Sequence, residues 1–348
     1  MNKKLEEIIK DFNPDENGLH HHGIFGLPFG VEESKLILLP IPWEATVSYK
    51  GGTANGPKAI LDASQQIDLY DPLFPGAWKE GLAMADIPSS ILYNNQYTRE
   101  KVLKYLDKYV EGDIDLNLQE QINKECADLK DYVKETTASL LKDGKIVGIV
   151  GGDHSVPLGY LESLSEIHPD FGVLHIDAHA DLREAYEGFT YSHASIFYNA
   201  LKIKNISQIV SVGIRDFSQG EFDLMQREKS RLAIFTDYEM KKAIFEGGTV
   251  KQKFAEIISK LPKLVYISFD IDGLLPYLSP NTGTPVVGGL SIEELVYLFE
   301  EILASGRKVI GFDLCEVGQG QGDWDGNVGA RVLYKLCLIA LKSSQINK

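Results

Sequence analysis

Short apolar runs recur along the chain, and valine, isoleucine and leucine fill both faces of most of them. The runs cover residues 36–42, 145–152, 171–179, 208–216, 231–239, 264–272 and 308–317. A strand that is apolar on both faces is typical of a parallel sheet covered by helices on each side. Helical patterns lie between several of the runs, so the alternation predicts βαβ units with right-handed crossovers.

Two stretches carry helical patterns that can be located from the residues. Residues 291–306 form the clearer one. Ser291 can cap its N-terminus, Glu294 follows three residues later, and Gly306 marks its end. Residues 97–142 are highly charged and predict one or two surface helices.

The domain organisation is simple. The 348 residues contain no repeat, low-complexity tract or linker, which predicts one domain. We expect residues 35–345 to form this domain and residues 1–34 to form an irregular arm wrapped on it.

Composition and charge exclude several classes of partner. The formal net charge of −15 at pH 7 argues against binding to nucleic acid or to anionic membranes. Three cysteines without metal-like spacing indicate a reducing compartment. The N-terminus is acidic where a signal peptide needs an apolar stretch, and no run approaches the roughly 18 apolar residues of a membrane span. We therefore expect a cytoplasmic protein.

Charged side chains end four of the apolar runs, at the edge of a parallel sheet where ligands bind. They are Asp153 and His154, then Asp177, His179 and Asp181, then Asp270 and Asp272, and finally Asp313 and Glu316. In an extended chain, residues i, i+2 and i+4 share one face. We therefore expect Asp177, His179 and Asp181 to converge, and Asp270 and Asp272 to join them from another strand.

Carboxylates gathered in this way indicate a metal site. They repel one another and cannot all stay ionised in a pocket without compensation, which a divalent cation would provide. Two cations suit so many ligands better than one, because carboxylates can bridge. A mixed Asp and His set without thiolate fits Mn²⁺, and Ni²⁺, Co²⁺ and Fe²⁺ remain open. Taken singly, each motif would also fit ordinary polarity at a strand end.

Seven motifs in order resemble those of the ureohydrolases, the arginase–agmatinase–formiminoglutamase family, over residues 35–340. They are "PWEATVSYKGGTANGPKAI" (42–60), "GGDHS" (151–155), "DAHAD" (177–181), "SHAS" (192–195), "SFDID" (268–272), "NTGTPVVGGLS" (281–291) and "DLCEV" (313–317). The resemblance implies an α/β fold, a three-layer α/β/α sandwich with a mainly parallel sheet of eight strands. It also implies a homotrimer or homohexamer.

The same resemblance implies two Mn²⁺ ions per subunit. One ion would be held by His154, Asp177, Asp181 and Asp270. The other would be held by Asp177, His179, Asp270 and Asp272. Asp177 and Asp270 would then bridge the two ions.

Four further residues receive roles from the resemblance. Glu316 would hold a guanidinium group through charge-assisted hydrogen bonds. His193 would be a proton shuttle that protonates the departing amine. Thr284 and Asp153 would support the site, and the products would be urea and an amine. Without the resemblance, His193 is better interpreted as a loop histidine and Glu316 as a member of an ion pair.

Some conspicuous residues are left out of the predicted site. His175 lies on a strand and is interpreted as a packed core histidine. The triplet His20–His22 lies in a glycine-rich arm, where three adjacent side chains do not converge. Gly51, Gly52 and Gly56 are interpreted as turn glycines, because no phosphate-binding pattern surrounds them.

The substrate is predicted from two positions. Arginases recognise the α-amino group partly through an aspartate in a segment like residues 213–221, and this chain has Ser218 at that position. Arg183 stands where arginases have an asparagine near the substrate carboxylate. We expect both residues to contact a small guanidino substrate. The lost acidic contact favours agmatine, with putrescine as the product, and leaves arginine second.

Other activities remain open. Formiminoglutamases also carry an arginine after the "DAHAD" motif, but they usually lack the shuttle histidine that His193 resembles. Other guanidino acids, a deacetylase-like metalloenzyme and a non-catalytic metal-binding subunit are the further alternatives. Leu275 and residues 317–326 depart from the family pattern and are expected to flank the mouth of the active site.

Overall fold

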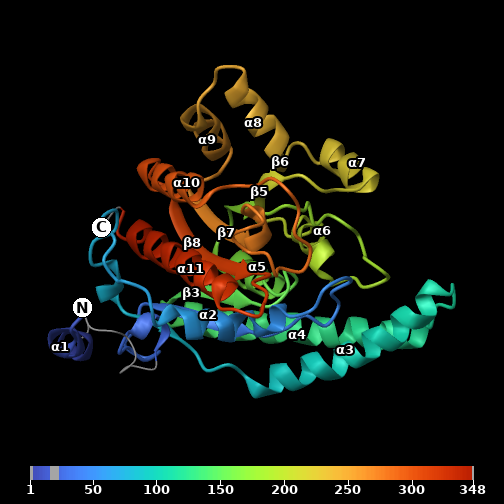
Figure 1. Cartoon of the computed structure of the whole chain (residues 1–348), viewed down its shortest axis with the longest axis horizontal. Helices are drawn as coiled ribbons and strands as arrows, with labels where there is room; N and C mark the ends of the chain where they lie inside the picture. Colours follow the sequence, from blue (N-terminus) through green and yellow to red (C-terminus); the bar gives the residue numbers. More distant parts are fainter. Residues whose placement is uncertain (1–2, 16–22, 347–348) are drawn as a thin grey trace.

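The computed structural model describes residues 3–15 and 23–346. At its centre lies an eight-stranded sheet with the order β2-β1-β3-β8-β7-β4-β5-β6 (Figure 1). The strands are β1 (Leu36–Ile41), β2 (Leu82–Met84), β3 (Ile146–Gly151), β4 (Phe171–Ile176), β5 (Ile206–Ile214), β6 (Leu232–Thr236), β7 (Leu264–Asp270) and β8 (Lys308–Cys315). Every pairing in the sheet is parallel, so the sheet is wholly and not only mainly parallel.

Helices cover both faces of the sheet, which confirms the three-layer α/β/α sandwich (Figure 1). They are α1 (Lys3–Asp11), α2 (Gly56–Ser64), α3 (Ser89–Val110), α4 (Leu116–Lys142), α5 (Leu158–Ile167), α6 (Ile196–Ala200), α7 (Gln219–Arg227), α8 (Asp237–Phe245), α9 (Val250–Ser259), α10 (Ile292–Ala304) and α11 (Trp324–Ser343). One apolar core joins the sheet to α2, α9, α10 and α11, and the other joins it to α3, α4, α5 and α6. No helix in the described part of the chain is long and apolar enough to cross a membrane.

The predicted helices are confirmed. Ser291 Oγ accepts a hydrogen bond from the Glu294 N–H at 3.1 Å, and Glu294 Oε2 accepts one from the Ser291 N–H at 2.9 Å. This reciprocal capping box starts α10. Gly306 follows the helix with a φ of 75°, which glycine adopts without strain. The charged stretch forms two helices, α3 and α4.

The N-terminal segment differs from the expected irregular arm. Residues Lys3–Asp11 form the helix α1, and Leu5 is buried. Phe25 packs edge-on against Tyr334 of α11 with ring centroids 4.9 Å apart. The segment is therefore partly helical and joined to the apolar core. His20–His22 lie outside the described residues, and the boundary at residue 35 stays a prediction.

The order of the strands explains why charged residues from distant parts of the sequence meet. The four strands that end in charge, β3, β8, β7 and β4, lie next to one another in the middle of the sheet. Because parallel strands end at the same edge, the residues that follow them are neighbours. The functional side chains therefore gather at the centre of this edge.

Candidate metal centre and active site

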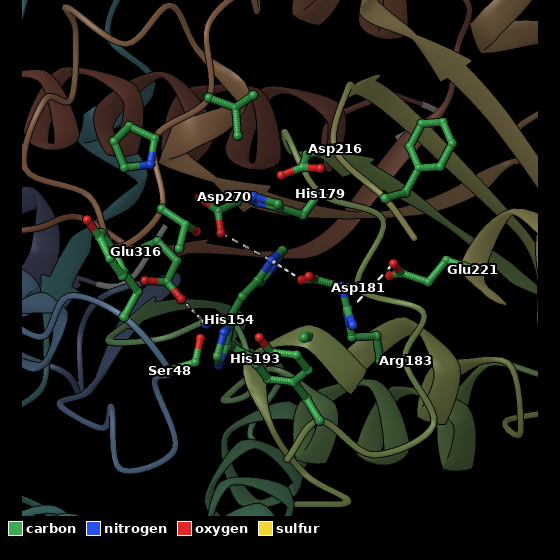
Figure 2. Close-up of a pocket in the computed structure, with 17 residues that line it drawn as sticks. Ser48, His154, His179, Asp181, Arg183, His193, Asp216, Glu221, Asp270 and Glu316 are labelled. Carbon is green, nitrogen blue, oxygen red and sulfur yellow. Dashed lines mark hydrogen bonds and ion pairs between the residues drawn. The ribbon is translucent and has the colours of Figure 1, made fainter. Parts of the chain in front are cut away.

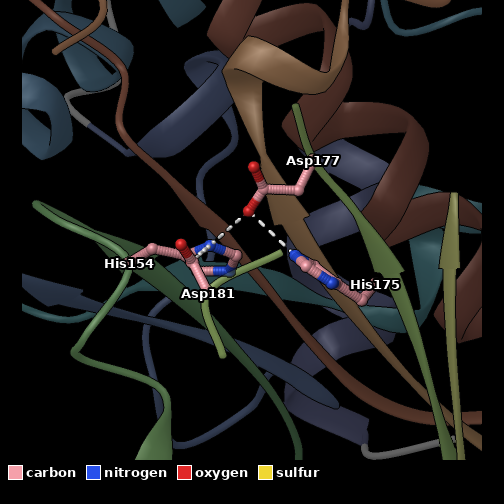
Figure 3. A group of neighbouring side chains, drawn as sticks. All are labelled: His154, His175, Asp177 and Asp181. Atoms are coloured by element: carbon pink, nitrogen blue, oxygen red, sulfur yellow. Dashed lines mark hydrogen bonds and ion pairs between the residues drawn. The ribbon is translucent and has the colours of Figure 1, made fainter. Parts of the chain in front are cut away.

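The first group of predicted ligands surrounds one nitrogen of His154. His154 Nδ1 lies 3.0 Å from Asp177 Oδ2, 3.2 Å from Asp181 Oδ2 and 3.5 Å from Asp270 Oδ2. All four side chains are buried, and Figure 3 shows the first two carboxylates beside His154. The structure thus brings together the four residues predicted to hold one ion.

The second group surrounds His179. His179 Nδ1 lies 3.0 Å from Asp272 Oδ2 and 3.5 Å from Asp177 Oδ1. Asp177 therefore turns one carboxylate oxygen to each histidine, which is the arrangement that a bridging ligand needs. Asp270 Oδ1 accepts a hydrogen bond from the Asp272 N–H at 2.8 Å, and its bridging role stays a prediction.

The residues converge for a reason that differs in part from the one expected. Strand β4 ends at Ile176, before Asp177, and Asp181 has a left-handed φ of 53°. Strand β7 ends at Asp270, and Asp272 lies in a short 3₁₀ turn. The extended-chain argument therefore holds only in part, because Asp270 still belongs to its strand and His179 forms a parallel bridge with Asp216. The turns that follow the strands orient Asp181 and Asp272.

Hydrogen bonds from the backbone to the carboxylates hold these turns. Asp177 Oδ1 accepts the His179 N–H at 2.6 Å, which closes the turn after β4. Asp272 Oδ1 accepts the Ala178 N–H at 2.9 Å, which ties the turn after β7 to the turn after β4. An Asp side chain suits such turns because it accepts from backbone donors two residues away.

The protein alone does not balance the charges at this site. Burial and the neighbouring Asp177 charge raise the pKa of Asp181 to about 7. Burial, Asp272 and Asp177 raise the pKa of Asp270 well above its usual range. Burial opposes ionisation of Asp177, but the neighbouring histidines outweigh it and lower its pKa. Divalent cations would offset this repulsion, and carboxylate oxygens with imidazole nitrogens are donors that suit Mn²⁺.

A cysteine lies near His154 but on the other side of its ring. His154, Asp313 and Cys315 form a further group of possible ligands. However, His154 Nε2 is engaged by Ser268 Oγ at 2.9 Å, and Ser268 Oγ donates to Asp313 Oδ2 at 2.7 Å. These hydrogen bonds through Ser268 orient the His154 ring, so that its Nδ1 faces the predicted aspartate ligands.

His175 is a residue whose contribution sequence reasoning missed. It is fully buried and packs on Phe197 with ring centroids 3.8 Å apart, so its interpretation as a core histidine is confirmed. Its Nε2 also lies 2.8 Å from Asp177 Oδ2, and its Nδ1 lies 3.0 Å from Ser211 Oγ. Burial lowers the pKa of His175, so the neutral ring can donate to Asp177 from behind. Its place two residues before Asp177 was the available signal.

A cavity of about 460 Å³ opens onto the histidines and carboxylates (Figure 2). Among the residues that line it are eight that the sequence predicted: His154, His179, Asp181, Arg183, His193, Asp270, Thr284 and Glu316. Asp177 and Asp272 contact the lining histidines without lining the cavity themselves. Leu275 and residues 317–326 do not line it, and their expected position beside its mouth stays a prediction. Within residues 317–326, Asp325 Oδ1 accepts a hydrogen bond from the Asn281 backbone N–H at 2.8 Å.

Glu316 and His193 face this cavity. Glu316 Oε1 accepts the His154 N–H at 3.1 Å, and burial with the Asp153 charge raises the pKa of Glu316. Asp153 is buried behind the cavity, where its Oδ1 accepts from Ser155. Burial, followed by the charges of the two metal-site histidines, lowers the pKa of His193 to about 4. At neutral pH its ring is therefore neutral, and its Nδ1 has no hydrogen-bond partner among the described residues.

The wall opposite Glu316 is more acidic than the sequence indicated. Ser218 does not line the cavity, because its Oγ caps α7 and donates to Glu221 Oε2 at 2.8 Å. Asp216 and Glu221 line the cavity instead (Figure 2). The capping-box spacing of Ser218 and Glu221 was the signal that could have assigned Ser218 to the helix cap. A substrate contact by Ser218 stays a prediction.

Arg183 is the guanidinium that lines the cavity. Its Nε lies 3.7 Å from Glu221 Oε2, and its guanidinium carbon lies 4.8 Å from the centre of the Tyr186 ring. The side chain is 42% exposed, so solvent weakens this ion pair. Arg183 therefore partly neutralises the acidic wall.

Comparison with known proteins agrees with this geometry. The model of the arginase family matches residues 34–338. An N(1)-aminopropylagmatine ureohydrolase of Thermus thermophilus is 31% identical over 318 residues, which cover 91% of this chain and 94% of the relative. An agmatinase of Halalkalibacterium halodurans is 32% identical over 289 residues, which cover 82% of this chain and 84% of the relative.

Solved structures show the same fold. The agmatine ureohydrolase of Thermoplasma volcanium has a TM-score of 0.71 at 23% identity, covering 99% of this chain and 100% of that one. An arginase of Bacillus subtilis has a TM-score of 0.63 at 20% identity, covering 87% of this chain and 98% of that one. With the family match and with relatives more than 30% identical, they confirm the family that the motifs predicted. The chain belongs to the arginase family and is a ureohydrolase, a hydrolase acting on carbon–nitrogen bonds in linear amidines.

Proposed function

We propose that this ureohydrolase binds two Mn²⁺ ions and hydrolyses agmatine to urea and putrescine. The observation that carries the proposal is Asp177, whose two carboxylate oxygens face two separate groups of ligands. One group is His154, Asp181 and Asp270, and the other is His179 and Asp272. Two divalent ions would offset the four aspartates of these groups.

The charge of the cavity supports a dicationic substrate. Beyond the four aspartates, three carboxylates line or face the cavity, those of Asp216, Glu221 and Glu316. Arg183 supplies one positive charge, so two formal negative charges remain when Glu316 is ionised, a state that bound cations and a guanidinium would favour. Agmatine carries a guanidinium at one end and an ammonium at the other, which matches both the sign and the number. Arginine adds a carboxylate that would meet the acidic wall.

The side chains of the cavity have separate tasks in this reaction. When bound, the two ions would supply Lewis acidity and lower the pKa of a water at the site. Glu316 holds the guanidinium by charge-assisted hydrogen bonds, with its orientation set by the His154 N–H. The ring of His193, which is neutral at neutral pH, can accept a proton released in the reaction and pass it to the departing amine. Asp216 and Glu221 bind the distal ammonium.

A longer amine is the second candidate substrate. One relative is named as an N(1)-aminopropylagmatine ureohydrolase, and the cavity of about 460 Å³ has room beyond the four-carbon chain of agmatine. The acidic wall would suit an additional ammonium as well. Arginine, other guanidino acids and formiminoglutamate remain alternatives, because Arg183 could turn from Glu221 to a carboxylate.

The substrate is tested by a panel assay on the Mn²⁺-loaded protein. Urea release is measured with agmatine, N(1)-aminopropylagmatine, arginine, guanidinobutyrate and free guanidine, and formamide release with formiminoglutamate. We expect the highest kcat/KM for agmatine or its aminopropyl derivative. A preference for arginine would contradict the substrate and keep the reaction. No product from any of the six compounds would contradict the proposed function.

Assembly and location complete the proposal. We propose that the protein forms a homotrimer or homohexamer, as the resemblance to ureohydrolases implies. We also propose that it is located in the cytoplasm. All three cysteines are buried and free, which suits a reducing compartment. Light scattering on the purified protein should give three or six chains per particle, and a monomer would contradict the assembly.

A further inference from the structure

Two segments that line the active-site cavity are held by the long helices α3 and α4, which lie side by side along the molecule (Figure 1). We call residues 43–50 the entrance loop, because Ser48 and Tyr49 line the cavity. We call residues 186–193 the histidine segment, because Tyr186 and His193 line it. Neither helix lines the cavity itself.

Helix α3 binds the entrance loop through side chains one turn apart. Arg99 Nη1 donates to the carbonyl oxygens of Ala45 at 3.1 Å and of Val47 at 2.5 Å. Asn95 Oδ1 accepts the Glu44 N–H at 2.7 Å. Positions i and i+4 lie on one face of a helix, so this face of α3 is matched to the loop.

Helix α4 binds the histidine segment in the same way. Asn123 Oδ1 accepts the Thr190 N–H at 2.8 Å, and Asn123 Nδ2 donates to the Gly188 carbonyl at 3.1 Å. Gln119, one turn earlier, donates to the same carbonyl at 3.1 Å. Gly188 has a φ of 86°, and a Cβ there would lie 1.7 Å from Gln119 Nε2. The tight turn before His193 therefore packs directly against α4, with no room for a side chain at Gly188.

Each of these side chains forms hydrogen bonds with backbone groups of one segment only. Helix α3 also acts on the histidine segment, because the charge of Arg99 acts on Glu187 and His193 and because Tyr105 packs on Phe189 with ring centroids 5.1 Å apart. Backbone groups two to four residues from Tyr49 and three residues from His193 are fixed by these hydrogen bonds. The two positions differ in function, because Tyr49 is 80% exposed at the mouth of the cavity while His193 lies near the metal-site histidines. The hydrogen bonds of Arg99 and Asn123 therefore fix different walls, one near the mouth of the cavity and one near His193.

We infer that the paired helices α3 and α4 position the two walls of the active site. Arg99 is the positioning residue of the entrance loop, and Asn123 is the positioning residue of the histidine segment. The kinetic part of this inference rests on the proposed function. It predicts that loss of Arg99 acts mainly on KM and that loss of Asn123 acts mainly on kcat. Only Asn123 forms hydrogen bonds with the backbone before His193, whereas Arg99 acts on His193 through its charge alone.

The kinetic test compares Arg99→Met and Asn123→Ala in the full-length, Mn²⁺-loaded protein. We expect Arg99→Met to raise KM for agmatine about tenfold and to keep kcat within about twofold. Asn123→Ala should lower kcat about tenfold and keep KM within about twofold. Arg99→Lys should recover part of the lost affinity, because its ammonium can still reach one carbonyl. The matched control is Lys101→Met, which breaks the 3.3 Å contact between Lys101 of α3 and Glu125 of α4 without touching either segment. The inference would be overturned if Arg99→Met, Asn123→Ala and Lys101→Met changed the kinetic constants equally, or if none of them changed either constant.

A second measurement does not depend on activity. Hydrogen exchange followed by mass spectrometry reports the protection of each segment in the wild type and the variants. We expect Arg99→Met to speed exchange in the entrance loop alone and Asn123→Ala to speed it in the histidine segment alone. Arg99→Lys replaces Arg99→Met if the latter does not fold. If the wild type hydrolysed no guanidino compound but gave this crossed pattern, the proposed function would fail and the positioning role would stand. A uniform change in both segments would overturn the positioning role.

Discussion

Asp177 is the side chain on which the proposed metal centre depends. Its Oδ2 faces His154 and its Oδ1 faces His179, while His175 contacts it from behind. An anion that touches three histidines explains why its pKa is lowered although it is fully buried.

Replacing His179 or Asp272 by alanine should remove one ion and keep the other. Both side chains belong to the second group alone, whereas His154 and Asp181 remain in the first. We expect about one bound Mn²⁺ per chain by elemental analysis, with a folded protein by circular dichroism. Asp216→Asn is the control, because Asp216 lines the same cavity without belonging to either group, and it should keep both ions. Full metal content in His179→Ala would show that the ligand assignment is wrong.

Replacing His193 by alanine should lower turnover and spare the metal. Loss of a general acid typically costs about two to four orders of magnitude in rate. His193 lies outside both ligand groups, so Mn²⁺ content should stay at the wild-type value. Urea release and elemental analysis on the same preparation separate the two effects. A joint loss of metal and turnover would mean that His193 is a ligand or a structural residue.

Among the elements of the fold, the point where the ends of β1, β3 and β8 meet determines the position of His154. Gly152 follows β3, and its carbonyl oxygen accepts the Glu316 N–H at 2.7 Å. A Cβ at Gly152 would lie 2.0 Å from the carbonyl oxygen of Trp43. The ends of β1, β3 and β8 therefore meet too closely for any side chain.

Gly152→Ala should consequently lower both stability and metal binding. Overpacking of this kind typically costs on the order of 1–3 kcal/mol, and here backbone and not a flexible side chain must move. We expect a lower Tm by calorimetry and weaker Mn²⁺ binding, because His154 is only two residues away. Gly220→Ala on α7 is the control, since nothing lies within 4 Å of an added Cβ there. An unchanged Tm in Gly152→Ala would contradict this view of the junction.

Elements could be predicted where the pattern is local. Each of the seven apolar runs overlaps a strand, and the capping residues of α10 stand where expected. Strand β2 has only three residues, so no apolar run predicted it. Only the family resemblance implied an eighth strand. Helix α1 was missed because it lies in a segment that was expected to be irregular.

The site could be predicted only in part, because some of its residues depend on loop folding and not on a local sequence pattern. The metal-site residues follow buried strands, and the sheet brings strand ends together. The roles of Asp216 and Glu221 depend on how a loop after β5 folds over the cavity, which no local pattern specified. The motif position pointed to Ser218, whose hydroxyl turned out to serve a helix cap.

At the scale of the whole molecule, stability should depend on metal and pH together. In the metal-free protein the pKa of Asp181 is about 7, above the value of about 4 in an unfolded chain. Burial favours the neutral ring of His154, but Asp177, Asp181 and Asp313 outweigh it and raise its pKa. Groups with raised pKa values contribute stability at low pH that is lost as the pH rises through the folded pKa.

The Tm of the metal-free protein should therefore fall between about pH 4 and pH 8. With Mn²⁺ it should rise over the same range, because binding needs ionised carboxylates and releases their protons. Thermal melts with and without Mn²⁺ at several pH values measure both slopes. Parallel slopes with and without Mn²⁺ would contradict a metal centre at these residues.

The central claim is a two-ion centre that hydrolyses a guanidino substrate. It is tested most directly by adding Mn²⁺ stepwise to the metal-free protein while bound ions and urea release from agmatine are measured together. We expect little turnover at one ion per chain and full turnover at two, with no further gain beyond that. Full turnover with one ion bound, or two bound ions without urea from agmatine, would contradict it.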